Sequence, residues 1–169
     1  MSLSKSIFKN DTLNRIIVFL DEIGIEVLPA SLPDNTFLPG TNIAGGKIWV
    51  DESKLLSPGD VLHEAGHLAV VPSNEREILA ESDAINAPGN ELAAIAWSWA
   101  ALKYLDIDPS VVFHNQGYKG GANSIIENFS NNRYFGVPVL QYRGLCYEPQ
   151  MAFKNGLPPY PSMLKWTAD

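Results

Sequence analysis

The sequence predicts an α+β fold, in which a small mixed or antiparallel sheet packs on two long helices and an irregular segment follows. Three observations indicate this class. Residues 47–51 form a β-branched and aromatic run, residues 58–71 and 88–105 have the length and apolar content of helices, and residues 136–169 are rich in proline. The chain has 169 residues, without an internal repeat or an evident boundary. We therefore expect one domain over 1–169.

The N-terminal part predicts one helix and the strands of the sheet. Apolar residues recur at helical spacing over 11–23, and Gly24 follows where such a helix would end. The short apolar run at 25–28 is typical of a strand. Residues 29–46 contain three prolines and three glycines, which predict a loop or hairpin leading to the strand at 47–51.

The first long helix has a clear start signal in the dipeptide Ser57-Pro58. Serine is a favoured N-cap residue, and proline is tolerated at the first helical position. We expect this helix to continue to about Val71 and to stop at Pro72.

The second long helix, residues 88–105, has apolar residues on every side. A helix without a polar face is expected to be buried, so Trp97 and Trp99 are predicted to belong to the core. A helical turn at 110–115 and a short helix at 122–129 should follow, before the proline-rich end wraps the domain irregularly.

Composition excludes several function classes. Twelve Lys and Arg against nineteen Asp and Glu give a formal charge of −7, so a nucleic-acid partner is not expected. The single cysteine, Cys146, excludes an intrachain disulfide and a thiolate zinc cluster. The apolar stretches are shorter than the roughly 20 residues that span a bilayer, and we see no secretory signal. We therefore expect a cytoplasmic protein without a membrane partner.

Two of the three histidines flank a glutamate in the segment His63-Glu64-Ala65-Gly66-His67. Four helical residues rise about 6 Å and return to nearly the same face, so the two imidazoles can point at one metal ion. Two imidazole nitrogens suit Zn²⁺. Glu64 lies about 100° around the helix from His63 and can accept a proton from a water bound to the metal.

A chance match is the alternative to this zinc site. The preceding strand, the helix start signal and the scarcity of histidine elsewhere favour the metal site. Gly66 is unfavourable inside a helix. It removes a side chain beside His67 and would let the second helix or the metal approach closely, although ordinary glycine usage also accounts for it.

A catalytic zinc site needs a third protein ligand, and Glu91 is the best candidate. It lies in the first turn of the second long helix, where a carboxylate among Ala, Ile and Trp needs a partner. The alternative is that Glu91 only favours the helix dipole. Glu81 and Asp83 in the connecting segment are rival ligands, and His114 is a weaker one.

The segment His63-Glu64-Ala65-Gly66-His67, followed by Asn90-Glu91, resembles the gluzincin group of zincin metallopeptidases. Its short layout is most similar to the ImmA/IrrE-like metallopeptidases, over about residues 43–109. The resemblance implies a zincin-like minimal domain with a Zn²⁺ cofactor and metalloendopeptidase activity on a peptide or protein. It assigns the metal to His63, His67 and Glu91, and the general base to Glu64.

The chain departs from thermolysin-like enzymes four residues after the third ligand. Those enzymes have an acid there to orient a ligating histidine, whereas this chain has Ile95. The orienting group is therefore expected from Asp83, Glu81 or a backbone carbonyl. We find no helix-turn-helix module of the kind that often accompanies ImmA/IrrE-like proteins.

The implied mechanism needs further residues. Zinc would polarise the scissile carbonyl, while Glu64 takes a proton from water and passes it to the leaving amine. Candidate oxyanion donors are His114, Tyr118 and Tyr104.

Substrate binding is expected at the strand after Gly46. Ile48, Trp49 and Val50 could pair with an extended substrate by β-augmentation. The competing hypothesis is a non-catalytic, zincin-like metal-binding domain that acts through protein–protein interaction. A metal-free scaffold with the motif by chance is the third.

Overall fold

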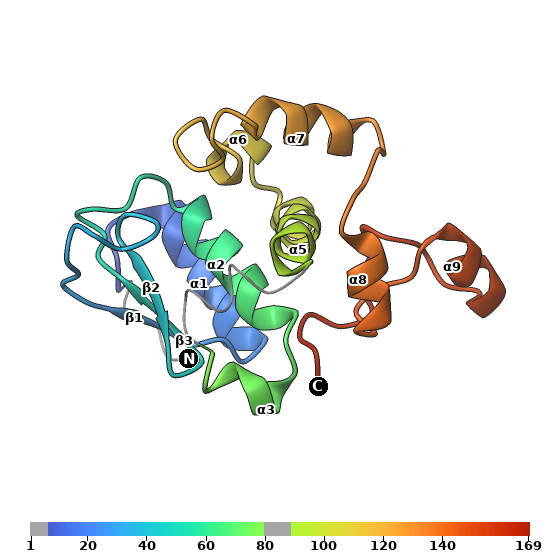
Figure 1. Ribbon diagram of the computed structural model, residues 1–169, viewed down its shortest axis with the longest axis horizontal. Coiled ribbons are helices and arrows are strands. Elements are labelled where there is room, and N and C mark those ends of the chain that lie inside the picture. The colour runs from blue at the N-terminus through green and yellow to red at the C-terminus, as the bar shows by residue number, and fades with distance from the viewer. Residues whose placement is uncertain (1–6, 80–88) are drawn as a thin grey trace.

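The computed structural model describes residues 7–79 and 89–169 and combines helices with one small sheet, as expected for an α+β protein (Figure 1). The elements of these ranges follow in the order α1 (Asp11–Glu22), β1 (Val27–Pro29), β2 (Thr41–Ala44), β3 (Lys47–Val50), α2 (Gly59–Ala69), α3 (Ser73–Arg76), α5 (Asn90–Leu105), α6 (Pro109–Val112), α7 (Ala122–Ser130), α8 (Val137–Tyr142) and α9 (Pro149–Asn155).

The three strands form a mixed sheet with β3 in the centre. β1 pairs with β3 in parallel, and β2 pairs with it antiparallel, so that Leu28 and Asn42 both lie opposite Trp49. The prediction that Ile48, Trp49 and Val50 bind an extended substrate by β-augmentation is therefore wrong. Both edges of β3 are already hydrogen-bonded within the sheet, whereas β1 and β2 provide its outer edges.

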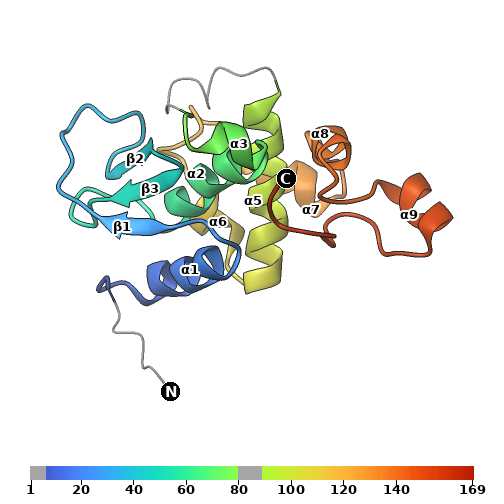
Figure 2. The same ribbon diagram turned by 90° about the horizontal axis from the view of Figure 1, so that it is seen from below.

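Helix α2 lies at the centre of the fold. It packs on β2 and β3 and contacts α1, and on its other side it packs along α5. Both views show the sheet and α5 on opposite sides of α2 (Figures 1 and 2). The sheet was predicted to pack on both long helices. Instead it packs on α2, and α2 lies between the sheet and α5. All residues of Gly59–Ala69 are buried as a result.

The first turns of α1 and α2 are capped differently. Asn10 caps α1 by accepting a hydrogen bond from the Leu13 backbone N–H at 2.9 Å. Ser57, predicted to cap α2, does not do so. Pro58 occupies the N-cap position, and the Ser57 hydroxyl donates instead to the Val111 carbonyl oxygen at 2.5 Å. A tertiary contact with the α6 segment therefore replaces the expected local cap.

Close approach of α2 and α5 depends on Gly66. A Cβ atom at this position would lie 2.9 Å from the carbonyl oxygen of Ala94. This confirms that the glycine lets the second helix approach the histidine-bearing helix, because any larger residue would push the two backbones apart.

Helix α5 begins at Asn90, directly after Gly89 with its positive φ of 75°. The expected start at Pro88 lies outside the described residues. Trp97 and Trp99 are fully buried, as predicted, and the Trp97 indole N–H donates to the Trp166 carbonyl oxygen at 2.9 Å. In the part of the chain that the structure describes, α5 and the other helices are too short or too polar to cross a membrane.

The proline-rich end is more regular than predicted. It contains α8 and α9, and each has a proline in its first turn, Pro138 and Pro149. Proline is compatible with this position, so these residues begin helices instead of preventing them. The segment is attached to the core through the Tyr160 hydroxyl, which donates to the Ala96 carbonyl oxygen at 2.7 Å. The predicted turn at 110–115 and helix at 122–129 correspond to α6 and α7.

Candidate metal centre

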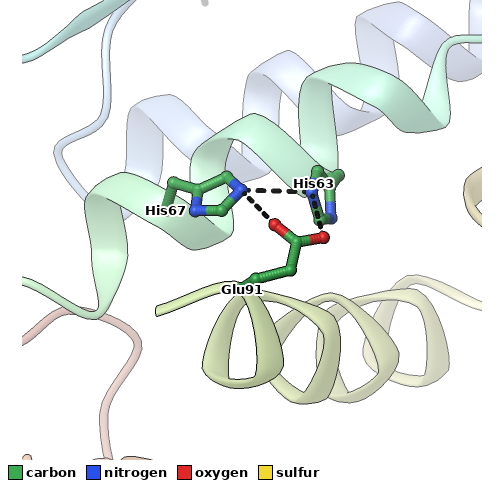
Figure 3. Close-up of side chains that lie close together, drawn as sticks. All are labelled: His63, His67 and Glu91. Carbon is green, nitrogen blue, oxygen red and sulfur yellow. Dashed lines mark hydrogen bonds and ion pairs between the residues drawn. The ribbon is translucent and has the colours of Figure 1, made fainter. Parts of the chain in front are cut away.

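His63 and His67 lie on one face of α2 and point toward α5 (Figure 3). Their Nε2 atoms are 3.1 Å apart, and both side chains are buried. The four-residue spacing produces this arrangement, because it returns the second side chain to nearly the same face of the helix.

Glu91 completes a group of three from the first turn of α5. Its Oε1 lies 3.4 Å from the Nε2 of His63, and its Oε2 lies 3.0 Å from the Nε2 of His67. One ligand atom from each residue falls within 4.8 Å of the others. Two imidazole nitrogens and one carboxylate oxygen form the donor set of a catalytic zinc site, so these residues fit the ion.

Glu91 is less buried than its place in an apolar helix predicts. Its side chain is 43% exposed, so it lies at the rim of the site and is not a buried carboxylate that requires a partner. Its convergence with two buried imidazoles is the stronger argument. His114 does not take part in this group, and the rival ligands Glu81 and Asp83 lie outside the described residues.

Asn90 fixes the tautomer of His67. Its amide oxygen contacts the His67 Nδ1 and can only accept a hydrogen bond, so Nδ1 must carry the proton. In the neutral ring, the Nε2 lone pair is then available toward Glu91. We expected this orienting role from Asp83, Glu81 or a backbone carbonyl. Asn90 was noted in the sequence only as the neighbour of Glu91.

Tyr118 performs the corresponding role for His63. Its hydroxyl oxygen lies 3.1 Å from the His63 Nδ1 and can accept a hydrogen bond from a protonated Nδ1. The two rings meet nearly edge-on at 82°. Tyr118, predicted as an oxyanion donor, thus lies beside His63 and can orient its ring. No short-range pattern in the sequence links it to His63, from which it is 55 residues distant.

The titration behaviour of the three residues follows from their contacts. Burial disfavours the charged form of Glu91, but the two imidazoles outweigh this effect and lower the pKa of Glu91 strongly. Burial lowers the pKa of His63. Burial also opposes a charge on His67, but Glu91, Glu64 and Asn90 together raise the pKa of His67 above its usual value. His67 therefore holds a proton more readily than His63.

Glu64 is buried next to the site, with 1% of its surface exposed. Its charge favours the protonated form of His67 and helps to raise the pKa of Tyr118, after burial as the main cause. Glu64 is therefore close enough to act on both residues. Its role as a general base remains a prediction.

A cavity of about 360 Å³ opens beside the group of three. His63, Glu91 and Tyr118 contribute to its wall together with apolar side chains of other elements. This volume lies within the usual range of small-molecule and side-chain sites, about 300–1,000 Å³. A ligand in the cavity would contact His63 and Glu91, two of the three residues that could hold the metal.

The other two predicted oxyanion donors have different positions. The His114 Nε2 lies 2.6 Å from the Oδ1 of Asp60, a buried residue that sequence reasoning missed although it lies one turn before His63. Tyr104 is 66% exposed near the far end of α5 and contacts the rings of Phe19 and Trp166. The assignment of Tyr104 to the site is wrong, because the length of the helix separates it from Glu91.

Comparisons with known proteins gave no match among protein-family models, curated proteins or solved structures. The site must therefore be interpreted from its own geometry.

Proposed function

We propose that this chain is a zinc-dependent metalloendopeptidase with a zincin-like fold, acting on a peptide or protein. The observation that carries the proposal is the convergence of His63, His67 and Glu91 from two closely packed helices. Their mutual distances and the tautomer fixed by Asn90 support a ready-made zinc site, and the adjacent cavity supports access of a substrate.

In the proposed reaction, the zinc ligands and Glu64 have different roles. Bound zinc would supply a Lewis acid that polarises a carbonyl and acidifies water. In our proposal, the Glu64 carboxylate takes up a proton from that water and returns it to the leaving amine. The inclusion of a base beside the ligands favours an enzyme over a purely structural metal site.

Tyr118 is proposed to stabilise negative charge on the substrate. Burial raises the pKa of Tyr118 well above its usual value, so the hydroxyl keeps its proton. If the hydroxyl oxygen accepts a hydrogen bond from His63, its own O–H remains available to a substrate oxygen in the cavity.

The test is a comparison of the wild-type protein with Glu64→Gln. Both proteins should bind zinc equally by elemental analysis, because Glu64 is not a ligand. The variant should hydrolyse a library of fluorogenic peptides about 10²–10⁴-fold more slowly, the usual contribution of an acid–base group. Glu127→Gln, at an exposed position of α7, is the matched control and should retain full activity.

Two results would contradict the proposal. One is hydrolysis at the wild-type rate by Glu64→Gln. The other is a fully zinc-loaded wild-type protein that cleaves no peptide of the library, which would favour a non-catalytic metal-binding domain that acts through protein contacts.

A further inference from the structure

Asp60 is a buried carboxylate that the zinc chemistry does not use. It lies on α2, one turn before His63, with 1% of its surface exposed. The residue nevertheless lines the 360 Å³ cavity, together with His63 and Glu91. A charged group in this position needs partners, because burial in an apolar environment is costly.

Only one of the two Asp60 oxygens has such a partner. Oδ1 lies 2.6 Å from the Nε2 of His114, which can donate a hydrogen bond. Oδ2 is buried, and no described residue forms a hydrogen bond with it. The Ser57 backbone N–H also lowers the pKa of Asp60, less than His114 does, but Oδ2 has no hydrogen bond to it within normal geometric limits.

Asp51 shows how this chain satisfies a buried carboxylate that does not line the cavity. Its Oδ2 accepts from the Leu32 backbone N–H at 3.1 Å, and its Oδ1 accepts from the backbone N–H and the hydroxyl of Ser53 at 3.2 and 2.5 Å. Both oxygens are thus used. The contrast indicates that the Asp60 carboxylate has capacity for a donor that none of the described residues supplies.

The remainder of the cavity wall is mostly apolar. Phe37 and Leu38 precede β2, Ile95 lies one turn beyond Glu91 on α5, and Ile125 is on α7. Lys119 is exposed at the cavity, so its ammonium group can remain in water. An apolar wall with one buried carboxylate is complementary to a group with a hydrocarbon stem and a cationic end.

We propose that this cavity is a specificity pocket for a lysine or arginine side chain of the substrate, with Asp60 as the residue that recognises its positive charge. The inference rests on the proposed function for the identity of the substrate as a peptide. Asp60 is a specificity-determining residue here, since Glu64 and the metal ligands carry the chemistry.

The experiment measures binding instead of hydrolysis, so that its failure is distinguishable from failure of the peptidase proposal. Two acetylated and amidated pentapeptides, Ala-Ala-Arg-Ala-Ala and the same peptide with citrulline in the centre, are titrated into zinc-supplemented protein carrying Glu64→Gln. Citrulline has nearly the shape of arginine but no charge. We expect the arginine peptide to bind at least about tenfold more tightly, and Asp60→Asn to reduce this preference to within about threefold.

Two further variants make the result specific. Asp51→Asn, the matched buried aspartate, should keep the arginine preference. Ile125→Trp, which fills the cavity without changing Asp60, should weaken both peptides, and it covers the case in which Asp60→Asn fails to fold. Equal binding of the two peptides by the parent protein, a preference that survives in Asp60→Asn, or undiminished binding by Ile125→Trp would each overturn the proposal.

Discussion

The two ends of helix α5 serve different purposes within one continuous helix. Its first turn carries Asn90 and Glu91, which contact the histidines of α2. Its later turns carry Trp97, Trp99 and Leu102, which are fully buried in the core. The difference teaches that a helix with apolar residues on all sides can still carry residues that could hold a metal, provided that they are confined to one end.

The physical reason is the geometry of the α2–α5 contact. Gly66 brings the two helices together near Ala94, and the cavity opens beside the first turn of α5. Asn90 and Glu91 are tolerated there because each contacts a histidine across the helix contact. Farther along, the helix is enclosed by other elements, and apolar side chains pack better.

Trp97→Ala tests the later turns of α5, which are buried in the core. Of the substitutions described here, it should have the largest effect on stability. Removing a fully buried tryptophan should cost about 3–5 kcal/mol of the free energy of unfolding, because a large cavity remains. Urea denaturation measures this value. Leu92→Ala, at a half-exposed position of the same helix, should cost much less, at most about 1 kcal/mol. Similar losses in both variants would refute the assignment of this end to the core.

Asn90→Ala tests the first turn of α5, which contacts the histidines of α2. Zinc affinity should fall about 10–100-fold, the usual cost of losing the group that orients a ligating histidine. Competition with a fluorescent chelator gives the affinity. Asn155→Ala, at the exposed end of α9, provides the control. Unchanged affinity in Asn90→Ala would show that the tautomer of His67 does not depend on Asn90.

At pH values below the raised pKa of His67, zinc binding should release about one proton. The pKa of His67 is raised and that of His63 is lowered, so His67 is the residue that holds a proton at its Nε2 before zinc arrives. Below the raised pKa of His67, affinity should fall about tenfold per pH unit, because metal and proton compete for one atom. Calorimetry in buffers of different ionisation enthalpy counts the proton. Constant affinity between about pH 6 and 8 would contradict this assignment.

Tyr104→Phe should have the smallest effect. Tyr104 lies near the far end of α5 and contacts the rings of Phe19 and Trp166, so loss of its hydroxyl should change zinc affinity and peptide hydrolysis less than about twofold. Tyr118→Phe should reduce both measurably, because its hydroxyl contacts His63. A strong loss of activity in Tyr104→Phe would show that Tyr104 does contribute to the site.

Local patterns predicted the parts of the molecule that depend on nearby residues. Helical spacing gave α1, the β-branched run gave β3, and the four-residue separation placed His63 and His67 together. Glu91 was predicted from the expected ligand count and its place at a helix start. The two helix patterns and the strand pattern follow from one or two turns of backbone geometry, whereas the prediction of Glu91 depended on the chemistry of zinc coordination.

Features that depend on tertiary contacts were not predictable in the same way. Ser57 bonds to Val111 instead of capping α2, and the partner of His63 comes from Tyr118, far along the chain. Central placement of β3 depends on the pairing of β1, which no local pattern fixes. Asp60 could have been noticed from its spacing before His63, but its significance depends on the cavity.

The most direct test of the central claim is a zinc titration of the purified wild-type protein and three variants, His63→Ala, His67→Ala and Glu91→Ala. The wild type should bind one zinc ion per chain, and each variant should lose at least about 100-fold in affinity, more than an orienting residue contributes. His114→Ala, which removes the third histidine without removing a proposed ligand, should bind as the wild type does. The assignment of this site would be contradicted if the wild-type protein bound no zinc. It would also be contradicted if none of the three substitutions changed the zinc affinity.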